Sequence, residues 1–326
     1  MIHFYWQDHG EWGKFREVTR PTGNTETMFW VHRLLAKYGP IRNGRIGDPP
    51  PTDTEPGDVL VGHIGSWGGV PDRAVFPVVP WPGVSSGTWY DQYVFGPEAN
   101  RATLDAAKMI FAICGEHQLE ISKQDPLLLR WLPKVVRLDG VVDTELLYPR
   151  MKRSFSPPGE RGFLYMGMNC HEKGTRLFWE AQAATGFKAV SISDGRVEQR
   201  NLTCVTEFQS NTNVGFWQRI MEQCDFVVCP ARVDCQPQSV LENVARGLVP
   251  IVTAASGFDG PAIRIEATVE SIISGVKLAH GLSDDELRLR QDSGITHIRE
   301  HHSPKRFTAT LEEHMHDDLM GANIRW

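Results

Sequence analysis

Residues 224–255 read CDFVVCPARVDCQPQSVLENVARGLVPIVTAA, and the expected architecture follows from them. The apolar run at 226–228 predicts a buried strand of a parallel sheet, and the run at 251–253 predicts a second one. A polar loop between them leads to Pro237, which can open a helix because its missing N–H costs nothing there. Gly247 suits the position just after that helix. The stretch therefore predicts a strand–helix–strand unit of an α/β protein.

Two acids mark one end of this unit: Asp234 lies in the loop, and Glu242 lies inside the helix. Ligands of open parallel sheets bind beyond the carboxyl ends of the strands. There the backbone N–H groups of Gln238, Ser239 and Val240 would leave a helix N-terminus, where a diphosphate is favoured. Glu242 can accept hydrogen bonds from a ribose diol, and Asp234 can hold hydroxyls at the ligand's other end. A nucleotide-sugar has this layout; the alternative is that both acids are solvated surface charges.

The same stretch resembles the E-x7-E segment of retaining GT-B glycosyltransferases of family 4. The matching positions are Cys229, Pro230, Ala231, Asp234, Gln236, Pro237, Glu242, Ala245, Arg246, Gly247, Val249 and Pro250. One position departs from the family pattern, because the first acid is Asp234 where Glu is usual. The resemblance implies the GT-B fold: two Rossmann-like, doubly wound parallel-sheet domains that face each other across a cleft.

A second matching segment is 167–174, GMNCHEKG, which resembles the family's G-R-x-x-x-E-K-G. In relatives the Arg and the Lys bind the donor diphosphate together. Lys173 matches, which implies the same role here, whereas Met168 replaces the arginine. The nearest cationic substitutes in the sequence are Arg232 and His171. The alternative for Lys173 is a solvated lysine at the start of a helix.

The first half of the chain resembles the family more weakly. The segment PTGNTE at 21–26 is similar to the glycine loop that meets the donor phosphates, which makes Gly23 and Asn24 donor-site candidates. The alternative is simple helix capping by Asn24 or Thr25. The long preceding loop, 7–23, adds His9 and Trp12 as acceptor candidates, since loops of this length tend to be functional.

A histidine ends the strand expected at 58–63, and relatives often carry a cleft histidine at this position. His63 is therefore a candidate for the acceptor site and for catalysis, with Trp67 as a neighbour on the acceptor side. Relatives also carry a histidine after the next strand, here 75–79, and this chain has none there. His63, His117 or the backbone would have to take its place.

The order of strands and helices predicts two domains. Residues 1–150 form the acceptor-side domain and 151–304 the donor domain, because a polar Pro/Gly-containing linker begins at 150. The resemblance implies that the last helix, 305–326, packs back on the first domain. Further elements expected in the first domain are strands at 2–6, 106–113 and 134–138 and a helix from about 24 to 38.

Composition limits the partners. The chain has 326 residues and a net charge of −6 without a Lys/Arg block, which argues against nucleic acid. Residues 1–150 carry 15 Lys/Arg and 18 Asp/Glu, a net charge of −3, so a peripheral membrane contact is not indicated. No apolar run reaches the roughly 18 residues of a membrane span. Six cysteines without a C-x-x-C pair predict reduced thiols in a cytoplasmic protein.

The combined expectation is a retaining hexosyltransferase that moves a sugar from a nucleoside-diphosphate sugar to a hydroxyl of a glycan or small molecule. The resemblance implies a UDP- or GDP-sugar donor and neither a metal nor a cofactor. Two alternatives share the fold: a degenerate protein that only binds nucleotide or carbohydrate, and a nucleotide-sugar epimerase. A dinucleotide oxidoreductase is disfavoured, since no G-x-G-x-x-G opens a helix after a strand. The sugar, the base, the acceptor, the linkage and the oligomeric state stay open at this stage.

Overall fold

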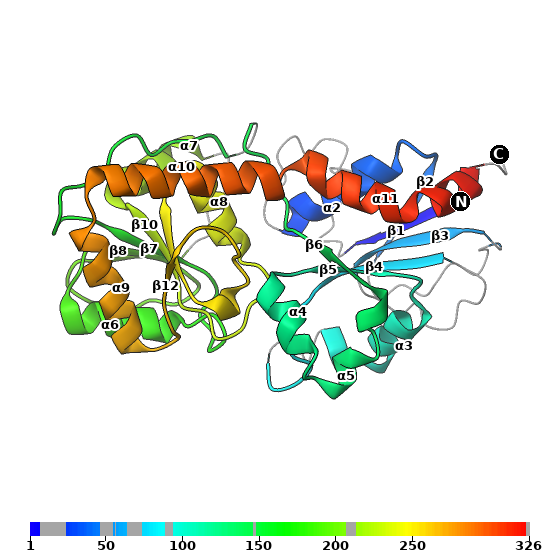
Figure 1. The fold of residues 1–326 in the computed structure, drawn as a ribbon, viewed down its shortest axis with the longest axis horizontal. Coiled ribbons are helices and arrows are strands. Elements are labelled where there is room, and N and C mark those ends of the chain that lie inside the picture. The colour runs from blue at the N-terminus through cyan, green and yellow to red at the C-terminus, as the bar shows by residue number, and fades with distance from the viewer. Residues whose placement is uncertain are drawn as a thin grey trace. The chain divides into compact units, whose positions relative to one another are not determined.

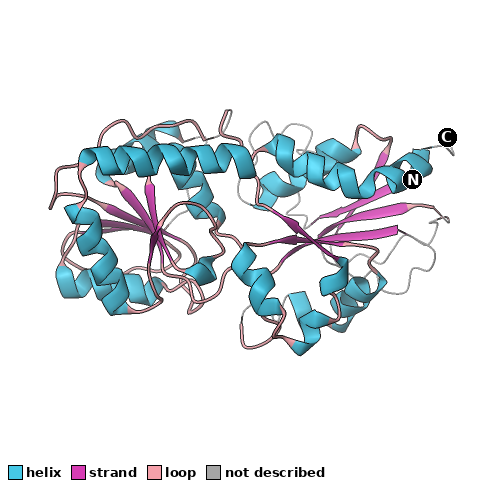
Figure 2. Ribbon diagram, viewed as in Figure 1, coloured by secondary structure: helices cyan, strands magenta, loops and turns pink. Residues whose placement is uncertain are grey.

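Each half of the chain is built on a six-stranded, all-parallel sheet with helices on both faces (Figures 1 and 2). The computed structural model describes residues 1–6, 24–45, 55, 57–63, 74–88, 94–145, 148–206 and 213–323. The chain divides into two compact units, one formed by 1–141 together with 304–326 and the other by 142–303. Both units are doubly wound α/β sheets, as the sequence predicts.

The first unit has the strand order β2-β1-β3-β4-β5-β6. Its strands are β1 (Ile2–Trp6), β2 (Ile41–Arg45), β3 (Val59–His63), β4 (Ala74–Pro80), β5 (Ile110–Ile113) and β6 (Val135–Leu138). Its helices are α2 (Asn24–Leu35) and α11 (Pro304–Asn323) on one face, and α3 (Glu98–Ala106), α4 (Glu116–Ser122) and α5 (Pro126–Leu129) on the other (Figure 1). The strand expected at 106–113 is wrong in its first part, because α3 ends at Ala106 and β5 begins only at Ile110.

Helix α11 belongs to the first unit because its apolar residues recur every fourth position. Phe307, Leu311, Met315 and Leu319 are all buried in one core cluster with strand residues such as Phe4. Away from this stripe, the helix is tied to the same unit by an ion pair of 2.7 Å between Lys108 and Asp318. The end of the chain therefore contributes to the core of the unit in which the chain begins.

The second unit has the strand order β12-β11-β10-β7-β8-β9. Its strands are β7 (Phe163–Met166), β8 (Ala189–Ile192), β9 (Leu202–Val205), β10 (Phe226–Cys229), β11 (Val249–Val252) and β12 (Ile263–Arg264). Its helices are α6 (Thr175–Thr185) and α9 (Val269–Gly281) on one face, and α7 (Val214–Gln223), α8 (Gln238–Arg246) and α10 (Asp284–His301) on the other (Figure 1). Separate apolar clusters fill the two faces, so the central strands are apolar throughout.

The division between the units falls after Val141 rather than after residue 150. Tyr148 is fully buried in the core of the second unit. Just beyond it, the backbone N–H groups of Met151 and Lys152 both donate to the carbonyl of Arg246 at the end of α8. The segment read as a polar linker is therefore anchored to the second unit by a buried aromatic ring and by hydrogen bonds.

Candidate functional site

The predicted site lies at the topological switch point of the second unit. Strands β7 and β10 are neighbours at the centre of the sheet, and the chain leaves them in opposite directions, to β8 and to β11. The loops 167–174 after β7 and 230–237 after β10 therefore lie at the carboxyl edge of the sheet, where ligands of open parallel sheets bind. These are the two segments that the sequence singled out.

A close backbone approach joins the two loops. Gly174 has φ +70°, and a Cβ at this position would come 2.2 Å from the carbonyl oxygen of Pro230, so only glycine fits. The carbonyl of Glu172 also accepts hydrogen bonds from the backbone N–H groups of Arg232 (2.7 Å) and Val233 (3.2 Å). The loop after β7 is thus fixed on the loop after β10.

This arrangement brings Lys173 and Asp234 together. The Nζ atom of Lys173 lies 2.6 Å from Oδ2 of Asp234, whose side chain is also held by the N–H of Cys235 at 2.8 Å to Oδ1. Burial lowers the pKa of Lys173, but the attraction of the Asp234 carboxylate outweighs it and raises the pKa above its usual value. Lys173 is therefore a charged ammonium, and Asp234, at 3% exposure, is not the solvated loop acid of the alternative interpretation.

The start of α8 differs from the expectation at one residue. Gln238 and Ser239 are half-buried. Val240 is buried, and its N–H donates to the carbonyl of Pro237 at 2.9 Å. The prediction that Val240 offers its N–H to a ligand is wrong, because the first turn of the helix closes on Pro237. Ser239 Oγ donates to the carbonyl of Met166 at 2.9 Å, which ties the helix start to β7.

Glu242 lies in a buried polar cluster instead of on the helix surface. Its side chain is 4% exposed, and Oε1 accepts a hydrogen bond of 3.1 Å from the hydroxyl of Tyr148. Nη1 of Arg246 lies 3.9 Å from Oε2, and the guanidinium is sandwiched between the rings of Trp217 (3.9 Å) and Tyr148 (4.9 Å). Aromatic faces compensate a buried guanidinium. The role of Glu242 as a ribose ligand stays a prediction.

Sequence reasoning missed Tyr148 and Trp217 as partners of this cluster. The available signal was Arg246, a charged residue that directly follows the apolar pair Val244 and Ala245 at the end of the helix. A buried guanidinium needs a carboxylate and ring faces nearby.

The remaining donor-side candidates lie around the same loops. Met168 is 41% exposed, and its carbonyl accepts hydrogen bonds from Tyr165 (3.2 Å) and Thr175 (2.8 Å), so its side chain is not part of the core. His171 is exposed and Arg232 is half-buried. Both stay candidates for the missing arginine charge.

The candidates in the first unit are described only in part. His63 is the last residue of β3 and is half-buried, and Asn24 is the first residue of α2. Gly23, His9, Trp12 and Trp67 lie outside the described residues. The switch point of this sheet falls between β1 and β3, and the residues that follow these strands in the sequence, 7–23 and 64–73, are outside the described ranges as well.

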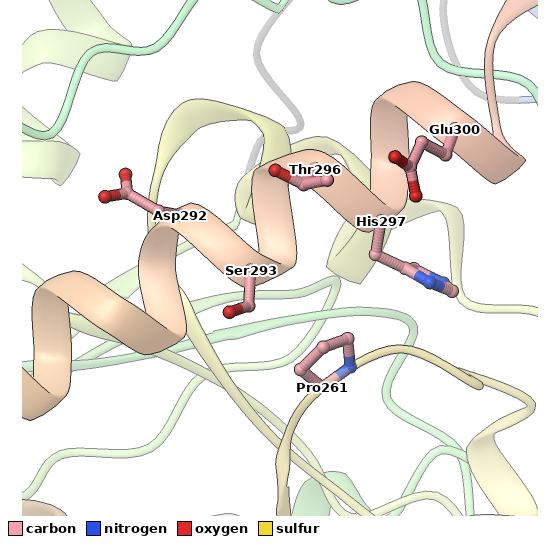
Figure 3. Close-up of a pocket in the computed structure, with 6 residues that line it drawn as sticks. All are labelled: Pro261, Asp292, Ser293, Thr296, His297 and Glu300. Atoms are coloured by element: carbon pink, nitrogen blue, oxygen red, sulfur yellow. The ribbon is translucent and has the colours of Figure 1, made fainter.

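A surface pocket of about 450 Å³ lies elsewhere in the second unit, along α10 (Figure 3). It is lined by Pro261, Asp292, Ser293, Thr296, His297 and Glu300. Its lining includes two carboxylates and two hydroxyls, and none of the predicted site residues lines it. Among the described residues, no group of three or more His, Cys, Asp or Glu side chains is arranged to hold a metal ion. None of the helices within the described ranges combines the length and apolar character of a membrane span.

Comparison of the whole structure with solved structures defines the fold as GT-B, the two-domain fold of many glycosyltransferases. Sucrose-phosphate synthase from Thermosynechococcus elongatus matches with a TM-score of 0.70 at 12% identity, over 97% of this chain and 98% of that chain. The N-terminal domain of Candida albicans trehalose-6-phosphate phosphatase matches with a TM-score of 0.64 at 11% identity, over 97% and 96% of the two chains. Anabaena HepE, solved with UDP and glucose, matches with a TM-score of 0.60 at 10% identity, over 97% and 99%.

No protein-family model matches the sequence, and no curated protein matches it. At 10 to 12% identity, the structural likeness concerns the fold. The activity has to be argued from the site.

Proposed function

We propose that this protein is a glycosyltransferase of the family 4 type, which transfers a sugar from a nucleoside-diphosphate sugar to an acceptor hydroxyl with retention of configuration and without a metal. The observation that supports this most is the meeting of Lys173 and Asp234 at the switch point, beside the start of α8. A cation, a carboxylate and a helix N-terminus in one crevice suit a diphosphate joined to a polyol.

The proposed roles follow the order of groups in the donor. Lys173 and the backbone at Gln238 and Ser239 stabilise the diphosphate, Asp234 accepts hydrogen bonds from sugar hydroxyls, and Glu242 accepts them from the ribose. Structure neighbours are consistent with such a ligand, since HepE was solved with UDP and glucose and Arabidopsis starch synthase IV with ADP and acarbose. For this chain we propose a UDP- or GDP-sugar.

The acceptor side is assigned to the first unit. The proposed contacts there bind either the acceptor or the donor phosphates. They are His63, Asn24, His9, Trp12, Gly23 and Trp67. Tryptophan rings offer apolar faces on which a sugar can stack. The six free cysteines fit a reducing compartment, so we place the reaction in the cytoplasm.

The proposed chemistry takes place on one face of the sugar. The bond from the anomeric carbon to the leaving phosphate oxygen breaks while the bond to the acceptor oxygen forms, and the proton of the acceptor hydroxyl moves to the leaving diphosphate. Negative charge grows on the diphosphate during this step. Lys173 and the helix amides would stabilise that charge, while the acids hold the reacting groups in place.

Calorimetry with nucleotides and nucleotide-sugars, followed by measurement of nucleoside diphosphate released with a panel of acceptors, tests the proposal. We expect binding of one nucleotide-sugar and acceptor-dependent release. Glu242→Ala should raise the donor KM about tenfold or more, and Lys173→Ala should mainly lower kcat. Binding without release under any acceptor would indicate a binding protein, and an isomerised sugar without an acceptor would indicate an epimerase.

A further inference from the structure

The ion pair of Lys173 and Asp234 affects which ligand the site prefers. The two charged atoms are 2.6 Å apart, and Asp234 is buried. Residues 167–174 contain no other Lys or Arg, since Met168 replaces the arginine of the family motif. The charge expected to bind a diphosphate is therefore already balanced by a carboxylate.

A phosphate bound to Lys173 would share the ammonium with Asp234. The ammonium has three N–H donors, so it can bond to both groups at once. A phosphate oxygen on a second N–H would lie roughly 4 to 5 Å from the carboxylate, a distance at which two negative charges repel each other in a partly buried site. The repulsion grows with the charge on the phosphate next to Lys173.

An intact nucleotide-sugar and a nucleoside diphosphate differ at this phosphate. In the nucleotide-sugar it is esterified by the sugar and carries one negative charge, and the sugar hydroxyls can donate to Asp234. In the nucleoside diphosphate it is a terminal phosphate with about 1.5 to 2 negative charges at pH 7, and no hydroxyl accompanies it. Asp234 would thus be satisfied by the first ligand and repelled by the second.

We propose that Asp234 makes the site select the intact nucleotide-sugar against the nucleoside diphosphate that remains after transfer, and so promotes release of that product. The inference rests on the proposed function, because it takes Lys173 as the ligand of the diphosphate. It assigns Asp234 a second task besides holding sugar hydroxyls.

The test compares dissociation constants for UDP, UDP-glucose, GDP and GDP-mannose between the wild-type protein and Asp234→Asn. Asparagine keeps the shape and the oxygen acceptor but removes the charge. We expect the affinity for the nucleoside diphosphate to rise about tenfold or more, while the affinity for the corresponding nucleotide-sugar does not rise. Asp285→Asn makes the same change of charge and is the control, because Asp285 is exposed in the first turn of α10. It should leave both constants within about twofold.

A second measurement needs no variant. The methyl ester of the terminal phosphate of UDP or GDP has the reduced charge without the sugar, so the wild-type protein should bind it more tightly than the unmodified nucleotide, by about threefold or more. An unchanged nucleoside diphosphate affinity in Asp234→Asn, or an equal gain for both ligand types, would overturn the selection by Asp234. If the wild-type protein binds none of the four ligands, the proposed function itself is wrong, and the inference falls with it.

Discussion

The hydroxyl of Tyr148 donates a hydrogen bond of 3.1 Å to the carboxylate of Glu242, across 94 positions of the sequence. Tyr148 follows shortly after the point where the chain enters the second unit, whereas Glu242 lies in the middle of α8. The bond therefore links the entry into this unit to the residue proposed to hold the ribose. Arg246 completes the cluster from the next turn of the same helix.

Tyr148→Phe should weaken both the stability of the second unit and donor binding. The loss of a hydrogen bond to a charged group costs about 1.5 to 3 kcal/mol of unfolding free energy, and a less firmly held Glu242 should raise the donor Kd about threefold to tenfold. Tyr38→Phe is the matched control, because Tyr38 donates to the carboxylate of Glu312 in the first unit. The control should lose stability without any change in donor Kd, as measured by urea unfolding and calorimetry. A donor Kd that is the same in Tyr148→Phe as in the wild type would show that this cluster does not contribute to donor binding.

Met168→Arg should strengthen donor binding. The side chain of Met168 is exposed, so the substitution restores the family's second cation without disturbing the core. A new charge-assisted hydrogen bond to the diphosphate is worth about 1.5 to 3 kcal/mol, so that the donor Kd should fall about tenfold or more. Asn169→Arg, at the exposed neighbouring position, places the same charge beside the family position and should have a clearly smaller effect. Equal effects of the two variants in calorimetry would mean that only net charge matters.

The buried pair of Lys152 and Asp225 should dominate the electrostatic stability of the second unit. Its atoms are 2.8 Å apart with both side chains buried, and Asp225 also accepts backbone hydrogen bonds from Ser156 and Gly162. Asp225→Asn leaves the ammonium of Lys152 buried without a counter-charge, which should cost about 3 to 5 kcal/mol.

The contrast for this prediction is the pair of half-buried Arg150 and exposed Asp292, with a similar separation of 2.9 Å. Because water screens this pair, Asp292→Asn should cost about 1 kcal/mol or less. Denaturant unfolding of both variants measures the difference. Losses of similar size would show that burial does not set the contribution of these pairs.

His3 should make the first unit less stable in mild acid. Burial lowers the pKa of His3 below its usual value, although the nearby Asp58 carboxylate opposes the change. Below about pH 6.5 the unfolded chain takes up a proton at this histidine while the folded chain does not, so the free energy of unfolding falls as the pH decreases through this window.

His3→Gln should flatten the decrease in stability between about pH 7.5 and 5.5, as followed by urea midpoints at each pH. The pKa of His280 in the second unit is lowered as well, mainly by burial, so a residual slope from that unit is expected. His117→Gln makes the same substitution in α4 and serves as the control. A slope that is unchanged in His3→Gln but altered in His117→Gln would contradict the assignment.

Most of the secondary structure could be predicted from local patterns. The central strands β7, β10 and β11 are continuous apolar runs, which is the pattern of strands buried on both faces. Strand β2, with the sequence IRNGR, was missed, because it is an edge strand with one apolar residue. Residues 98–106 form a helix whose alternating polar positions gave no such signal.

Residues of the site that belong to a sequence motif could be predicted. Residues that contact them from distant parts of the chain could not. The family resemblance of two segments implies that Lys173 and Asp234 lie in one site, and the structure brings these two side chains together. Their roles toward a ligand, and that of Glu242, stay predictions. The burial of Glu242 against Tyr148 and Trp217 was not predictable, nor was the hydrogen bond that closes Val240 on Pro237. Hydrophobic periodicity specifies which face a residue occupies, but not which distant residue packs against it.

The sequence by itself therefore determined the class of fold, the doubly wound sheets and the residues that gather at the carboxyl ends of the strands. The tertiary structure alone decided that Lys173 pairs with Asp234, 61 positions away, and that Tyr148 pairs with Glu242. The physical reason is that strand order brings β7 next to β10 and so sets two loops against each other. Local propensities act over a few residues, whereas the charge balance of the site depends on contacts that exist only once the sheet is assembled.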